Sequence, residues 1–147
     1  MVTLAERLRA AMTEARKLRD PARTLLLSTI VSDLKNREFE LRHDASDEEA
    51  ADVLRRGVKK RREAAALYQQ AGRTELADRE LTEVAILETF LPVAAGEDEV
   101  RGAVRAAIAD GAQDLGSVMG RVMPGLKGRA DGKLVNRVAR EELAASP

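Results

Sequence analysis

A glycine-rich basic segment near the C-terminus comes nearest, of all segments in this chain, to a phosphate-binding motif. Residues 125–133 read GLKGRADGK. A nucleotide-hydrolysing P-loop has four residues between its two glycines, followed by Lys and by a Ser or Thr whose hydroxyl holds magnesium. Here three residues separate Gly128 from Gly132, and Leu134 follows Lys133. The segment therefore does not predict nucleotide hydrolysis.

The same segment lies within a strongly basic stretch of the chain. Between positions 121 and 140 there is one acid, Asp131, against six basic residues, which are Arg121, Lys127, Arg129, Lys133, Arg137 and Arg140. Contacts of lysine and arginine with phosphates supply most non-specific affinity for nucleic acid, and free N–H groups at a helix start also attract anions. The stretch indicates either a surface for a nucleic-acid backbone or a solvated loop and helix face.

Composition limits the kind of nucleic-acid recognition that is available. Only Phe39, Tyr68 and Phe90 are aromatic, whereas proteins usually hold unpaired bases by stacking them on aromatic side chains. The 25 basic and 25 acidic residues cancel, so long-range attraction to a polyanion is weak. Any nucleic-acid binding must therefore rest on local patches that recognise shape and phosphates.

A second basic cluster occupies positions 55–62, where six of eight residues are Lys or Arg. Arg55, Lys59 and Arg62 are spaced at i, i+4 and i+7, so they form one stripe on a helix. The stripe is either a surface that faces RNA or a solvated face that answers an acidic neighbouring helix. The next helix carries more acids than bases, which favours the second interpretation; its acids are Glu75, Asp78, Glu80, Glu83 and Glu88.

The residue types needed for catalysis or metal binding are scarce. Cysteine is absent and His43 is the single histidine, which excludes disulfides, thiolate chemistry and multi-histidine metal sites. Most carboxylates stand at predicted helix starts or in i,i+4 pairs with arginine, and both positions are typical of exposed helix faces. No GxSxG nucleophile elbow is present. We expect no catalytic centre, no metal and no cofactor.

Apolar residues recur with the period of an α-helix throughout the chain, and no segment shows the alternation of apolar and polar residues that a strand would show. Capping boxes at Thr3 with Glu6 and at Ser46 with Glu49 predict two helix starts, and Asp20 followed by Pro21 predicts another. We expect the second helix to reach about Arg42, the third to stop at Gly72, and a fourth to run from Thr74 to Leu91 before Pro92. Three shorter helices follow, over 97–110, from Asp114 to a stop at Pro124-Gly125, and from Asp131 onward.

These elements predict an all-α protein of two small domains. An N-terminal four-helix region covers residues 1–92, and a C-terminal three-helix domain covers residues 97–147, with the boundary at 92–96. Some 50 residues lie near the lower limit for an independent core, so the second domain is expected to be marginally stable alone. No apolar run approaches the ~20 residues of a membrane span, and the N-terminus lacks a signal-peptide pattern. We expect a cytoplasmic protein that does not enter a membrane.

Two motifs in the C-terminal half carry a family resemblance. Residues 114–124 read DLGSVMGRVMP and residues 127–136 read KGRADGKLVN, while AGR at 71–73 and LETFLP at 87–92 mark the middle of the chain. These motifs are similar to those of the YqeY family, freestanding relatives of the tail of the tRNA-dependent amidotransferase B subunit. The resemblance implies an all-helical fold and association with tRNA or with an amidotransferase.

In the larger enzyme the catalytic cradle lies outside this tail, and the tail is understood to contact tRNA. The family label of carbon–nitrogen ligation with glutamine as amide donor therefore belongs to that enzyme, because this sequence has no glutaminase nucleophile and no ATP site. Position by position, the resemblance implies RNA contact by Lys127, Gly128, Arg129, Asp131, Lys133 and Asn136, to which the basic stretch adds Arg137. Structural alternatives are a turn at Gly128 and Gly132, and a bond from Asn136 to the loop backbone.

Three functions remain to be separated. The first is an accessory module that binds tRNA. It requires that the basic turn before the final helix points its charge outward, and it fails if neighbouring carboxylates neutralise those side chains. The second is a protein-interaction module that docks on an amidotransferase or an aminoacyl-tRNA synthetase through apolar helix faces. The third, an independent amide-forming enzyme, has the least support in the sequence.

Overall fold

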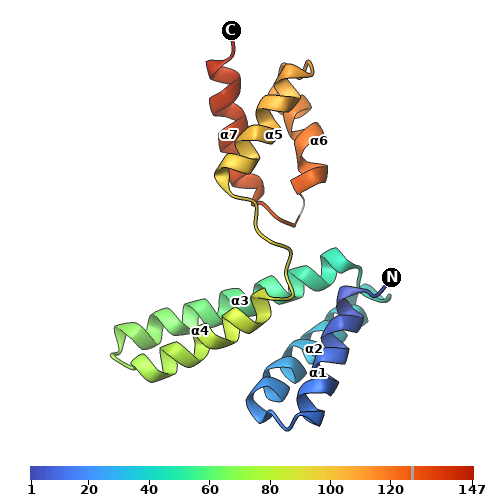
Figure 1. Ribbon diagram of the computed structural model, residues 1–147, viewed down its shortest axis with the longest axis vertical. Coiled ribbons are helices and arrows are strands. Elements are labelled where there is room, and N and C mark those ends of the chain that lie inside the picture. Colours follow the sequence, from blue (N-terminus) through green and yellow to red (C-terminus); the bar gives the residue numbers. More distant parts are fainter. Residues whose placement is uncertain (127) are drawn as a thin grey trace. The chain divides into compact units, whose positions relative to one another are not determined.

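The computed structural model describes residues 1–126 and 128–147 (Figure 1). The described residues form α-helices joined by turns and contain no strand, which confirms the all-α prediction. The helices are α1 (Leu4–Lys17), α2 (Pro21–Leu41), α3 (Asp47–Gln70), α4 (Thr74–Glu88), α5 (Glu97–Ala109), α6 (Leu115–Leu126) and α7 (Gly132–Ala145). None of them is long and apolar enough to cross a membrane.

The helix starts follow the side chains that the sequence places there. Both predicted capping boxes are present, at Thr3 with Glu6 and at Ser46 with Glu49. Asp20 accepts a hydrogen bond from the Arg23 N–H, ahead of a proline at the first helical position. These side chains satisfy N–H groups that have no partner within their own helix.

Two predicted helix ends are wrong. Helix α4 stops at Glu88 rather than at Leu91, because the next three N–H groups bond to carbonyls three residues back and tighten the chain into a 3₁₀-like turn. Helix α6 runs through Pro124 to Leu126 instead of stopping there. Pro124 removes the hydrogen bond to the Gly120 carbonyl, but Gly120 is exposed, so water can satisfy that oxygen.

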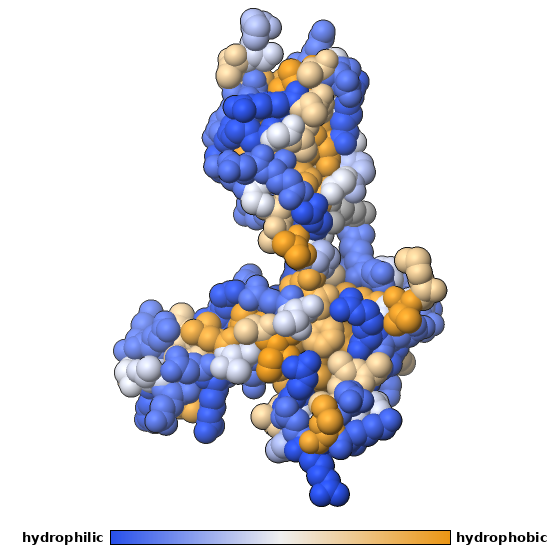
Figure 2. Space-filling model, viewed as in Figure 1, coloured by the Kyte–Doolittle hydropathy of each residue, from blue (hydrophilic) through white to orange (hydrophobic). Residues whose placement is uncertain are grey.

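The first compact unit spans Met1–Leu91. It consists of two helical hairpins, α1 with α2 and α3 with α4, and α3 also packs against α1 and α2 (Figure 1). Its aliphatic core includes Leu8, Leu27, Ile30, Leu54 and Leu87, all fully buried. In the face drawn in Figure 2, hydrophilic residues dominate the surface and hydrophobic residues show between them.

The second compact unit spans Pro92–Pro147 and packs α5, α6 and α7 around a core of its own. Val100, Val104, Val118, Val135 and Val138 form the centre of that core. Residues 92–96, which the sequence predicts to lie between the domains, belong with this unit: Ala95 is buried in its core, and the Ala95 N–H donates to the Arg129 carbonyl at 2.7 Å. Whether each unit folds alone stays a prediction.

Candidate nucleic-acid interface

The predicted site is the turn between α6 and α7 together with the first turns of α7. Lys127 lies outside the described residues. Gly128 has a φ of 77°, a left-handed conformation that glycine adopts without steric cost, which agrees with the turn alternative for this residue. The N–H groups of Arg129 and Ala130 both donate to the Leu126 carbonyl, at 2.8 and 3.0 Å. The turn thus folds back onto the end of α6.

Asp131 closes the N-terminus of α7. Its carboxylate accepts a hydrogen bond from the Lys133 N–H at 3.0 Å, as an N-cap does. Gly132 is the first residue of the helix. The role that these contacts give Asp131 is local: it satisfies the helix end and places a negative charge there, which opposes rather than assists the approach of a phosphate.

Arg129 is held by a carboxylate on α5. Its guanidinium forms a two-pronged ion pair with Glu99, at 2.8 and 2.9 Å, and its Nε donates to the Val93 carbonyl at 3.0 Å. Such forked pairs are the strongest geometry available between arginine and a carboxylate. The charge that the sequence assigned to RNA contact is therefore neutralised within unit 2.

Arg137 is also paired, and on two sides. It forms ion pairs with Glu97 at the start of α5 and, at 2.8 Å, with Glu141 one turn along α7. The hydrogen bond with Glu97, followed by the one with Glu141, raises the pKa of Arg137. Like Arg129, this residue does not present an uncompensated charge.

An arginine of α5 extends the same network. Arg101 donates to Glu141 at 2.7 Å and to Glu142 at 2.8 Å, so it joins α5 to the C-terminal half of α7. Its hydrogen bonds with Glu142 and then Glu141 raise the pKa of Arg101. Ion pairs thus join α5 to α7 along the edge of the aliphatic core.

Three basic residues of the stretch remain without a carboxylate partner among the described residues: Arg121, Lys133 and Arg140. All three are exposed. Arg121 donates to the Asp110 carbonyl at 2.9 Å, and the Arg140 Nε donates to the side-chain oxygen of Asn136 at 2.8 Å, contacts that leave each charge intact. Asn136 therefore bonds along α7, and the predicted alternative of a bond from it to the loop backbone is not among the contacts of the described residues.

One residue of the basic stripe of α3 pairs with the acidic helix α4, as the second interpretation expects, and the choice between the two interpretations stays a prediction. Arg62 pairs with Glu88 of α4 at 3.0 Å, and the adjacent Arg61 pairs with Glu83 at 2.9 Å. Arg55 pairs with Asp52 of its own helix at 2.8 Å. Lys59 is exposed and has no carboxylate partner in the described part of the chain. Two of the three stripe residues are thus engaged with acids.

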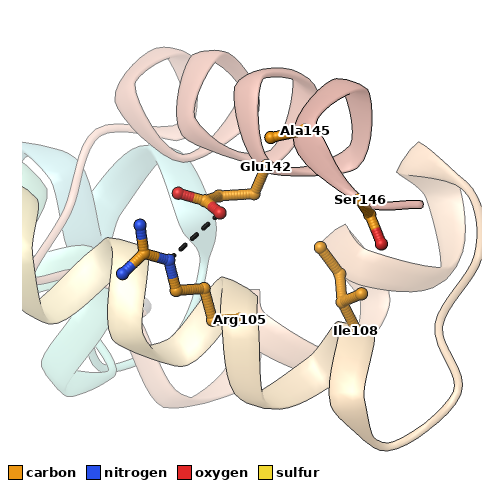
Figure 3. A pocket seen from close by; sticks show the side chains of 5 residues that line it. All are labelled: Arg105, Ile108, Glu142, Ala145 and Ser146. Atoms are coloured by element: carbon orange, nitrogen blue, oxygen red, sulfur yellow. Dashed lines mark ion pairs between the residues drawn. The ribbon is translucent and has the colours of Figure 1, made fainter.

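A small pocket between α5 and α7 has mixed polar and apolar walls (Figure 3). It encloses about 200 Å³, and in it Arg105 reaches across to Glu142 at 3.1 Å. Hydrogen bonds from Arg105 and then Arg101 lower the pKa of Glu142. A general base works best with a pKa near the operating pH, so this paired carboxylate suits an ion pair rather than catalysis. Among the described residues, no group of histidines and carboxylates has a metal-binding arrangement.

Sequence reasoning missed the part played by Glu97 and Glu99. Both stand in the first turn of α5, where acids complement the helix dipole. Their partners Arg137 and Arg129 lie 40 and 30 residues further on, so no local spacing links them. The only available signal was the composition of residues 92–147, in which eight basic and eight acidic residues balance.

Comparison with known proteins places the chain in a family. The family profile described as Yqey-like protein matches residues 5–143. The match covers nearly the whole chain, including every helix described above in full or in large part, and the chain belongs to the YqeY family. No curated protein matches the chain.

Proposed function

We propose that this chain is a non-catalytic accessory protein that binds the phosphate backbone of tRNA and assists glutamine-dependent tRNA amidotransfer. The observation that carries the proposal is the state of Lys133 and Arg140. They stand seven residues apart on α7, which places them on one side of the helix, and both are exposed with no carboxylate partner in the described residues. Phosphates are the natural partners of such a pair.

The proposed surface includes fewer cations than the basic stretch of the sequence, residues 121–140, contains. Lys133 and Arg140 make direct phosphate contacts, and Arg121 on α6 adds a third cation. Arg129 and Arg137 contribute only if phosphates displace Glu99 and Glu97. Side chains in those pairs are between one third and one half exposed, and ion pairs at such exposure contribute little to stability, so the exchange has a low cost.

The link to amidotransfer rests on the resemblance of residues 114–136 to the tail of the amidotransferase B subunit. The chain itself supplies binding, and the amide transfer from glutamine takes place on the larger enzyme. Glutamine- and ATP-dependent conversion of mischarged tRNA by the purified chain alone would overturn the non-catalytic part of the proposal.

The test is a titration of tRNA with the purified full chain across a salt series. Binding is expected to weaken as salt rises, because each phosphate contact releases bound counterions. The double variant Lys133→Glu with Arg140→Glu is expected to weaken binding and to reduce the salt slope by roughly two.

The matched control is Lys35→Glu with Arg79→Glu, which changes the net charge equally at exposed positions of unit 1. The control is expected to bind nearly as the unaltered chain does. Equal losses in the two double variants would show that only net charge matters, and salt-independent binding would contradict the proposal outright.

A second candidate, a protein-interaction module, is favoured by exposed apolar side chains in unit 1. Phe39 on α2 is 86% exposed and Leu67 on α3 is 66% exposed. The proposed partners are an amidotransferase or an aminoacyl-tRNA synthetase. Affinity purification from nuclease-treated extract tests it: recovery of such an enzyme supports the module, and its recovery only when RNA is intact assigns the association to RNA.

A further inference from the structure

The turn between α1 and α2 forms the wall of an open pocket of about 550 Å³, which we call the α1–α2 pocket. The residues that line it are Arg16, Arg19, Asp20, Pro21, Thr24, Leu25 and Ser28. Figure 2 shows hydrophobic and strongly hydrophilic residues side by side at this end of the hairpin, where α1 passes into α2. None of these residues belongs to the site described above.

The pocket and its border expose aliphatic surface. Leu25 is 71% exposed, and Leu18, the C-cap residue that follows α1, is 69% exposed. A single exposed leucine is ordinary. Here, however, Leu25 is part of a concave wall that also contains Pro21, and a concave apolar surface can enclose an incoming side chain and remove it from water.

Two cations, Arg16 and Arg19, and one acid, Asp20, line the pocket, and two further cations are close in the chain. Arg16, Lys17, Arg19 and Arg23 lie within eight consecutive residues that hold a single acid, Asp20. The Asp20 carboxylate is used as the N-cap of α2, where it accepts from the Arg23 N–H at 3.1 Å. None of the four cations has an ion pair with a described residue, in contrast to Arg129, Arg137 and Arg101.

The backbone holds this end of the hairpin in one shape. Arg19 adopts a left-handed conformation with a φ of 56°. The Asp20 N–H donates to the Ala15 carbonyl at 3.0 Å, and the Arg19 N–H donates to the Arg16 carbonyl at 3.2 Å. Glycine or asparagine takes a left-handed conformation at lower cost, so an arginine here retains a cation at the expense of some strain.

We propose that the α1–α2 pocket docks an acidic segment of a partner protein that inserts one apolar side chain beside Leu25. Arg16 and Arg19 complement the acidic residues of the segment, with Lys17 and Arg23 near them in the chain, and the aliphatic wall receives its apolar anchor. Unpaired RNA bases stack on aromatic rings, and no aromatic residue lies between Arg16 and Ser28. A protein surface that binds a membrane inserts protruding apolar side chains into it, whereas the apolar wall here is concave.

This inference deepens the second candidate function by naming a surface and the chemistry of its partner, and it does not depend on tRNA binding. The probe is a fluorescent synthetic peptide with one leucine among aspartate and glutamate residues, measured by anisotropy on the full chain. Two comparison peptides replace its leucine with serine or its acids with lysine. We expect the acidic leucine peptide to bind best, and either replacement to weaken binding about tenfold or more.

Two variants of the protein locate the site. Leu25→Ser removes the apolar wall, and Arg19→Asn removes a cation while asparagine still accepts the left-handed backbone. Their matched controls are Val2→Ser, an apolar residue of unit 1 that is 67% exposed, and Lys35→Asn, an exposed cation of α2. We expect both site variants to lose peptide binding and to keep tRNA binding, and both controls to leave peptide binding unchanged.

Several outcomes would overturn the inference. Equal effects of site variants and controls would show that the peptide does not use the α1–α2 pocket. Equal binding of the leucine and serine peptides would show that no apolar anchor is inserted. The peptide could also fail to bind while phosphatidylglycerol–phosphatidylcholine vesicles or tRNA bind the unaltered chain. If the Leu25→Ser variant then loses that binding, the surface belongs to a lipid or nucleic-acid partner instead.

Discussion

The guanidinium of Arg129 grips the carboxylate of Glu99 with two hydrogen bonds, at 2.8 and 2.9 Å, although 30 residues separate them in the chain. Together with the Arg137–Glu97 pair, this contact ties the α6–α7 turn and the first half of α7 to the start of α5. Two of the six basic residues of the stretch are thereby neutralised in the folded protein. Glu97 and Glu99 occupy two of the arginines that the proposed function would offer to phosphates.

The first prediction follows from that competition. Glu97→Gln with Glu99→Gln frees the charges of Arg137 and Arg129, so we expect tRNA to bind more tightly and the salt slope to steepen by roughly two. The matched control is Asp98→Asn, which removes an exposed acid of the same turn that has no ion pair among the described residues. A rise in affinity that the control reproduces would reflect net charge alone.

The second prediction concerns the ion pairs between α5 and α7. Arg101 contacts both Glu141 and Glu142, so Arg101→Gln leaves two carboxylates close together with less compensation. We expect α5 and α7 to lose protection against amide hydrogen exchange and the melting temperature of unit 2 to fall. Arg121→Gln, whose guanidinium contacts only a carbonyl, is expected to have a smaller effect. Equal protection in the two variants would show that the network is incidental.

The third prediction is that the stability of unit 2 depends on pH. Hydrogen bonds from Arg101 and then Arg137 lower the pKa of Glu141 below the ordinary 4.5, and Arg105 and then Arg101 lower the pKa of Glu142. Carboxylates with a depressed pKa stabilise the fold above their unfolded pKa, and this contribution is lost as pH falls through the folded value. We therefore expect hydrogen-exchange protection of α5 and α7 to decline below pH 4.5.

The double variant Glu141→Gln with Glu142→Gln provides the control for that measurement. Its protection is expected to be lower at neutral pH and to change less between neutral pH and the acid range, because the two titrating groups are gone. An acid-induced decline as steep as that of the unaltered chain would place the titrating groups elsewhere.

The fourth prediction tests how unit 1 is assembled. Glu38 of α2 accepts from Arg9 of α1 at 2.5 Å and from the Ala45 N–H at 2.8 Å, and its side chain is only 13% exposed. Glu38→Ala leaves a backbone N–H and a guanidinium without their acceptor, so we expect a loss of about 1 to 3 kcal/mol in the free energy of unfolding. Glu38→Gln keeps an acceptor and is expected to lose less. Chemical denaturation of both variants is the measurement, and equal losses would contradict the role given to the hydrogen bonds.

Most of the fold could be predicted from local sequence because its determinants are local. The side chains at Thr3, Ser46, Asp20 and Asp131 act within three residues of where they stand, so their patterns are legible in the sequence. The two errors, at Leu91 and Pro124, both concern helix ends. At Leu91 the end depends on a 3₁₀-like turn, and at Pro124 it depends on the exposure of the Gly120 carbonyl, neither of which residue spacing alone gives.

The candidate site was less predictable because charge compensation is not local. Nothing near Arg129 or Arg137 in the sequence identifies Glu99 and Glu97 as their partners. By contrast, the pairing of α3 with the acidic α4 was foreseeable, since consecutive helices joined by a short turn usually pack as a hairpin. The positive end of the α1–α2 hairpin escaped notice because its four cations are interrupted by Leu18, Asp20 and Pro21.

The proposed contact of α7 with tRNA can be tested most directly by nuclear magnetic resonance of the full, isotope-labelled chain during titration with tRNA. The account predicts that the signals of Lys133 and Arg140 and of their neighbours on α7 shift or broaden first, while those of the α3 stripe around Lys59 stay nearly unchanged. Perturbation confined to unit 1, or none at protein and tRNA concentrations that saturate binding in the low-salt tRNA titration, would contradict it.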